Sequence, residues 1–97
     1  MPSLILTEGA QADLVRLRQF LRQQNPQAAS RFGHTLAEAF DLLERNPHLG
    51  RPVESVVGLH RLVISFGSAG YVLHYRYRMG GDSLQVLTIR HSREAGD

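Results

Sequence analysis

The spacing of hydrophobic residues in the first half of the chain predicts a short strand and two amphipathic helices. The apolar run SLIL, residues 3–6, is typical of a strand, and Thr7 can cap the helix after it. Apolar residues then follow one helical stripe over residues 8–24 and a second over residues 29–43. The pair Asn25-Pro26 separates them, because asparagine caps a helix and proline fits its first turn. So tight a connection predicts an antiparallel helical hairpin.

In the second half the hydrophobic period changes to two, which predicts a three-stranded antiparallel meander. Residues 46–58 hold two prolines and two glycines, so much of this segment is expected to be loop. Alternating apolar residues then predict strands over 60–66, 71–78 and 83–91, separated by the turn sequences GSAG and MGGD. Residues 1–97 are therefore expected to form a single α+β domain of order β-α-α-β-β-β, with the helical hairpin packed on a twisted antiparallel sheet.

The same alternation assigns side chains to the two faces of the sheet. We expect the helices to cover the more apolar face, which carries Leu62, Ile64, Phe66, Leu73, Leu87 and Ile89. The other face then collects basic side chains, namely Arg61, His74, Arg76, Arg78 and Arg90. In the last strand both faces are half apolar, so a single bulge there would exchange Arg90 and His91.

Composition gives this face a specific chemistry. The chain has eleven arginines and no lysine, and the formal net charge is +2 with histidine neutral. Arginine grips phosphate or carboxylate in two places and stays charged at every relevant pH, and clustered arginines attract an anion that neutralises them. Arg93, just after the last strand, is expected to join the cluster. Two plainer interpretations stay open: a coding bias toward arginine, and an ordinary solvated sheet face.

Several classes of protein are disfavoured. The chain has no cysteine, so it has neither disulfides nor a thiolate site. Neither a His-x-x-x-His pair nor a carboxylate cluster has metal-ligand spacing, and we expect no metal and no cofactor. The N-terminal segment does not read as a signal peptide, and no apolar run approaches the ~18 residues of a membrane span. The protein is expected to be soluble and cytoplasmic, without a membrane partner.

Four segments together resemble the RelE/ParE superfamily of toxins from type II toxin–antitoxin systems, which includes plasmid stabilisation proteins. They are GRP at 50–52, HRLVI at 60–64, YVLHYRY at 71–77 and VLTIRHSRE at 86–94. The resemblance covers essentially the whole chain. It implies the fold predicted above, a bacterial setting, growth inhibition, and a cognate antitoxin that binds the toxin in a hetero-oligomer and neutralises it.

The resemblance implies one of two activities. ParE-like members are similar to poisons of DNA gyrase, whereas RelE-like members are similar to ribosome-dependent ribonucleases that cut mRNA without a metal. In a RelE-like toxin the catalytic residues would be Arg61, Arg90, His91 and Glu94. The loop over 47–58 lacks the lysines of RelE, and Asp97 stands where many relatives place an aromatic residue. These departures favour a ParE-like gyrase inhibitor; the ribonuclease and a non-toxic, antitoxin-binding remnant are the alternatives.

Binding roles follow from the same interpretation. The residues expected to bind the target or its phosphates are Arg61, His74, Arg76, Arg78, Arg90 and Arg93. Antitoxin carboxylates are expected at Arg16 and Arg31. Tyr71, Tyr75 and Tyr77 are expected to pack on the helices or on the antitoxin, with base stacking as the alternative if they are exposed. His48 and His60 are interpreted as loop residues with no nameable partner.

Overall fold

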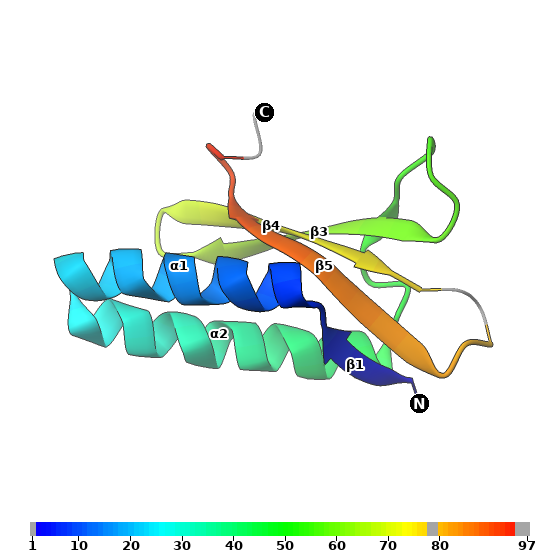
Figure 1. The fold of residues 1–97 in the computed structure, drawn as a ribbon, viewed down its shortest axis with the longest axis horizontal. Helices are drawn as coiled ribbons and strands as arrows, with labels where there is room; N and C mark the ends of the chain where they lie inside the picture. The colour runs from blue at the N-terminus through cyan, green and yellow to red at the C-terminus, as the bar shows by residue number, and fades with distance from the viewer. Residues whose placement is uncertain (1, 78–79, 95–97) are drawn as a thin grey trace.

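The computed structural model describes residues 2–77 and 80–94. Two helices lie against one face of a five-stranded sheet and leave the other face uncovered (Figure 1). The elements are β1 (Ser3–Leu6), α1 (Glu8–Gln24), α2 (Pro26–Arg45), β2 (Arg51–Pro52), β3 (Leu59–Phe66), β4 (Ala69–Arg76) and β5 (Ser83–His91). The predicted α+β architecture and order of elements are therefore confirmed, with β2 as an addition.

Both helices begin at the predicted caps. The Thr7 hydroxyl accepts a hydrogen bond from Ala10 N and also donates to Val86 O at 3.0 Å, which ties the start of α1 to β5. The Asn25 side chain accepts from the N–H groups of Gln27 and Ala28, with Pro26 in the first helical turn. No helix in the described part of the chain is long and apolar enough to cross a membrane.

The strand order is β1-β5-β4-β3-β2, and the sheet is mixed rather than wholly antiparallel. β1 runs parallel to β5, a pairing that sequence alternation cannot reveal because it joins the two ends of the chain. The outer edge of β1 is capped by helix side chains: Leu4 N donates to Glu44 at 3.0 Å, and Gln11 donates to Leu6 O at 3.0 Å. These contacts occupy backbone groups that would otherwise pair with another strand.

The alternation of β5 is broken by a bulge. Val86 lies opposite Tyr75, but Thr88 lies opposite His74, so Leu87 is one extra residue in the ladder. An extra residue reverses the face of everything on one side of it. Leu84 and Val86 are therefore fully buried beneath the helices. The prediction that Leu87 lies under the helices was wrong, since it lines a groove on the uncovered face.

Between the bulge and the end of β5, the side chains lie on the faces that alternation predicted. Arg90 pairs with Val72 on the uncovered face, and His91 pairs with Tyr71 on the helix face. The core between the helices and the sheet is built mainly from Phe32, Leu36, Leu43, Leu73, Tyr75, Leu84 and Ile89, all at most 1% exposed. This buried face holds the strands rigidly, so that it fixes the direction of the side chains on the opposite face.

Candidate functional site

A row of polar side chains crosses four strands on the uncovered face. Arg51 of β2 lies opposite Arg61 of β3, which lies opposite His74 of β4, which in turn lies opposite Thr88 of β5. Arg90 is in a neighbouring row, where it follows Val63 and Val72. We call Arg51, Arg61, His74 and Arg90 the basic face. These residues span positions 51 to 90 in the sequence. They come together because β2, β3, β4 and β5 pair side by side as antiparallel neighbours in one sheet.

His74 is the focus of this arrangement. Its Nδ1 lies 3.3 Å from the hydroxyl of Thr88. Partial burial lowers the pKa of the imidazole below its ordinary value of 6.5, and the charges of Arg61 and Arg90 lower it further. The ring is therefore predominantly neutral at physiological pH. Because Arg61 and Arg90 both lower the pKa of this one imidazole, both guanidinium groups lie close to His74.

The arginines of the basic face have no ion-pair partner among the residues that the structure describes. Within residues 2–77 and 80–94, the ion pairs join Arg16 to Asp13 and Glu94, and Arg45 to Asp41. None involves Arg51, Arg61 or Arg90. Neighbouring positive charges without acidic partners favour binding of an anion, because it removes their mutual repulsion.

A groove of about 440 Å³ runs along the same face. It is lined by Leu59, His74, Leu87, Thr88, Arg90 and Glu94. Its size falls within the range of ~300–1,000 Å³ that is usual for ligand sites. The bulge contributes an apolar side chain, Leu87, beside the imidazole and the guanidinium, so the groove combines charge with an apolar wall.

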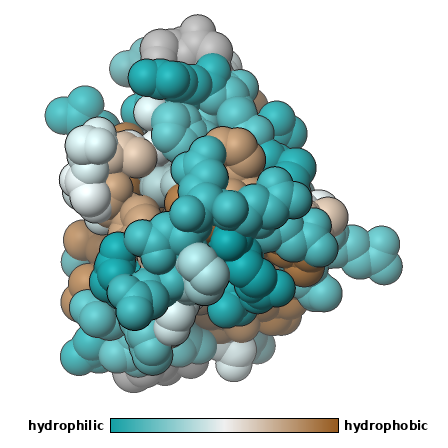
Figure 2. Space-filling model, turned by 90° about the vertical axis from the view of Figure 1, so that its left-hand side faces the viewer, coloured by the Kyte–Doolittle hydropathy of each residue, from teal (hydrophilic) through white to brown (hydrophobic). Residues whose placement is uncertain are grey.

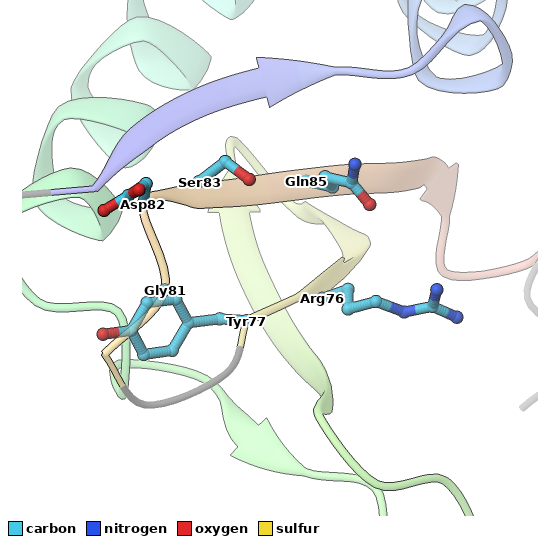
Figure 3. A pocket seen from close by; sticks show the side chains of 6 residues that line it. All are labelled: Arg76, Tyr77, Gly81, Asp82, Ser83 and Gln85. Atoms are coloured by element: carbon cyan, nitrogen blue, oxygen red, sulfur yellow. The ribbon is translucent and has the colours of Figure 1, made fainter.

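The far end of β4 and β5 extends this surface. Arg76 lies opposite Gln85. Figure 3 shows the side chains of Arg76 and Tyr77 leaving the chain in opposite directions. Tyr77 instead lies edge-on to His48, with ring centroids 5.5 Å apart. Arg76 is therefore placed to continue the basic face, whereas Tyr77 is not.

The four residues proposed for catalysis are not brought together. Arg61 and Arg90 share the basic face, but the His91 ring lies on the helix side, edge-on to Tyr71 at 5.2 Å. Glu94 reaches one end of the groove, yet one of its carboxylate oxygens is paired with Arg16 and the other accepts from His91 N at 3.0 Å. Because His91 follows Arg90 in β5 and faces the opposite side, His74 rather than His91 lies beside the two arginines.

The other predicted target-binding residues are divided. Arg76 is exposed next to the basic face, and Arg93 instead lines an apolar pocket on the helix side with Phe20 and His91. Arg78 lies outside the described residues. Of the predicted cluster, the structure thus joins Arg61, His74, Arg76 and Arg90.

The predicted antitoxin-binding residues also separate. Arg16 and Arg31 are exposed on the helices, whereas Tyr71 and Tyr75 are buried in the core, 3% and 0% exposed. The Tyr75 hydroxyl donates to Pro47 O at 2.7 Å and accepts from Gly50 N at 2.8 Å. Burial raises the pKa of both tyrosines. Packing on the helices is therefore what these tyrosines do, and neither offers a surface to bases or to an antitoxin.

Two histidines interpreted as loop residues have defined partners. His60 belongs to β3, is only 7% exposed, and stacks on Tyr75 with ring centroids 5.0 Å apart. His48 lies 6.2 Å from His60, measured between ring centroids. The interpretation of His60 as a loop residue was wrong, because it lies inside β3 with its ring packed on Tyr75, in agreement with the predicted strand over 60–66. No three His, Asp or Glu side chains of the described chain come close enough together to hold a metal ion.

Arg51 was missed by the sequence interpretation. It lies in a segment rich in proline and glycine that predicted only loop, and a two-residue strand has no periodicity to detect. The close approach of Gly50 to the core explains the position of Arg51. A Cβ at Gly50 would lie 2.8 Å from the Tyr75 ring and 2.9 Å from Arg61 O, so glycine lets β2 approach β3.

Comparisons with known proteins agree with one another. The family described as "ParE toxin of type II toxin-antitoxin system, parDE" matches residues 4–96. Toxin RelE3 of Caulobacter vibrioides is 35% identical over 94 residues, covering 97% of this chain and 98% of that protein. Toxin RelE1 of the same species is 35% identical over 92 residues, covering 95% of each.

A solved structure is also similar. A chain of the chromosomal ParDE toxin–antitoxin system from P. aeruginosa superposes with a TM-score of 0.74 at 26% identity, and the match covers 94% of this chain and 96% of the other.

Proposed function

This chain belongs to the ParE toxin family and is thus a type II toxin of the ParE/RelE superfamily, and we propose that it inhibits DNA gyrase through its basic face. Family membership implies a cognate antitoxin. The proposal includes a cytoplasmic location, where gyrase acts, and antitoxin contacts at the exposed Arg16 and Arg31.

One observation carries the proposal: Arg51, Arg61 and Arg90 lie on the uncovered face without an ion-pair partner among the described residues, and Arg90 lines its groove. Gyrase works on DNA, so its complex offers phosphate groups to such a surface. The basic face is therefore suited to bind the phosphates of a protein–DNA complex.

The arrangement of proton-transfer groups also favours inhibition over cleavage. Attack of a ribose hydroxyl on its phosphate needs a base and an acid for the leaving oxygen. On the described part of the basic face, His74 is the one group suited to this near neutral pH. His91 faces the helices, and Glu94 is already bound by Arg16 and by a backbone N–H.

Purified protein separates the two activities. We expect it to block supercoiling by purified gyrase and to leave cellular transcripts intact after induction. Fragmented transcripts at translating ribosomes, together with unaffected supercoiling, would contradict gyrase inhibition. Expression without any growth arrest would instead support a non-toxic remnant that retains antitoxin binding.

The second candidate function is ribosome-dependent mRNA cleavage, and the neutral His74 between two arginines favours it. An imidazole with a lowered pKa can accept the proton of a ribose hydroxyl while the guanidinium groups bind the phosphate. The names of the two Caulobacter relatives, both RelE toxins, point the same way. On this mechanism, His74→Gln abolishes RNA cleavage but preserves ribosome binding; for a gyrase inhibitor, it has little effect on supercoiling inhibition.

A further inference from the structure

The loop between β2 and β3 presents two consecutive valines to solvent. Val57 is 88% exposed and Val56 is 41% exposed. Single apolar side chains scattered on a surface are common, whereas two adjacent ones at the tip of a projecting loop are a candidate contact for a partner. We call Val56 and Val57 the valine tip.

The loop is held in shape by its own backbone. Val53 N donates to Leu59 O at 2.8 Å, Val56 N to Val53 O at 3.2 Å, and Leu59 N to Val56 O at 3.2 Å. Gly58 closes the loop with a φ of +82°, a conformation that glycine adopts without strain. Because these bonds already fix the backbone, little ordering would be required when a partner covers the valines.

The loop stands beside the basic face. Figure 1 shows it rising from the sheet on the side away from the helices. It leaves the sheet at β2, which carries the exposed Arg51, and returns at Leu59, which lines the groove. The uncovered face is therefore bordered by an apolar projection next to arginines.

We propose that the valine tip inserts into an apolar depression on a protein, while Arg51 and Arg61 meet carboxylates beside it. This inference rests on the proposed function and makes the protein surface of the target, rather than nucleic acid alone, the main contact. Valine has no ring to stack on a base, and Glu54 in the same loop would be repelled by a phosphate backbone. Both features fit a protein surface better than RNA.

Other exposed apolar side chains provide a control. Val15 of α1 is 55% exposed, and it belongs to the helix layer, away from the basic face. The end of the molecule shown in Figure 2 is largely hydrophilic, with separate hydrophobic areas rather than one continuous surface. Val15→Asp thus makes the same chemical change as Val57→Asp on a different surface.

The test compares Val57→Asp, Val57→Ser, Val57→Ile and Val15→Asp in the intact chain. Growth arrest is measured after induction, and binding of the purified proteins is measured to gyrase and to a single-stranded RNA oligonucleotide. Val57→Asp and Val57→Ser are expected to relieve arrest and weaken gyrase binding at least about tenfold, whereas Val57→Ile and Val15→Asp behave like the parent. Thermal unfolding identifies any variant that fails to fold. If Val57→Asp fails to fold, the comparison rests on Val57→Ser.

Each alternative outcome has a distinct meaning. If Val57→Ser arrests growth like the parent, the valine tip is not a target contact, even where an Arg61→Ala/Arg90→Ala variant is inactive and the proposed function stands. If the parent does not bind gyrase but Val57→Ser still relieves arrest, gyrase is the wrong target and the tip contacts another protein. If Val57→Ser loses RNA binding, the inference is overturned. The same holds if its only change is that the antitoxin no longer neutralises it.

Discussion

Replacing Arg61 and Arg90 together by alanine is expected to abolish growth arrest while the protein still folds. Both side chains converge on His74 from different strands, and neither has an acidic partner among the described residues. A hydrogen bond to a charged group contributes about 1.5–3 kcal/mol, so losing two weakens target binding about a hundredfold or more. Surviving colonies after induction measure the effect.

A matched variant shows whether position or charge is responsible. Arg22→Ala combined with Arg45→Ala also removes two positive charges, but from the exposed surfaces of α1 and α2. It is expected to arrest growth like the parent. Arg22, Arg45 and Arg90 are exposed, and Arg61 is half-buried without an ion-pair partner among the described residues, so both double variants should unfold near the parent's temperature. Equal toxicity of the two double variants would show that the basic face is not the functional surface.

Leu84→Ala is expected to cost far more stability than Leu87→Ala. Leu84 is 0% exposed beneath the helices, and removing a buried leucine side chain typically costs about 2–5 kcal/mol. Leu87 is the extra residue of the bulge and is only half-buried on the groove side, so its truncation should cost about 1 kcal/mol or less. Denaturant unfolding of the three proteins measures the difference.

Without a bulge, the two leucines would exchange places. Uninterrupted alternation back from Ile89 places Leu87 beneath the helices and Leu84 on the uncovered face. It therefore predicts that Leu87→Ala is the more damaging change. Finding that order would mean that β5 has no bulge and that Leu87 does not line the groove beside His74.

Much of the fold follows from local signals in the sequence. Thr7 and Asn25 are capping residues with immediate backbone partners, so both helix starts were predicted to the residue. The strands β3 and β4 alternate without interruption, which placed Arg61 and His74 on the same face. These predictions succeed because each depends on neighbours a few residues away.

The remaining features depend on contacts between distant parts of the chain. The parallel pairing of β1 with β5 joins residues about 80 positions apart. Arg51 enters the basic face only because Gly50 can lie against Tyr75, a contact invisible in the sequence of a loop. The bulge left Arg90 and His91 unassigned in sequence, since either face of β5 was sufficiently apolar to be buried.

An NMR titration of His74 tests most directly whether the arginines of the basic face converge. In the parent, the imidazole should titrate below its ordinary pKa of 6.5, because burial and the two arginines disfavour its protonated form. In the Arg61→Ala/Arg90→Ala variant its pKa should rise, while Arg22→Ala/Arg45→Ala leaves it unchanged. A His74 pKa that is at or above 6.5 in the parent and stays the same when Arg61 and Arg90 are replaced would contradict the account.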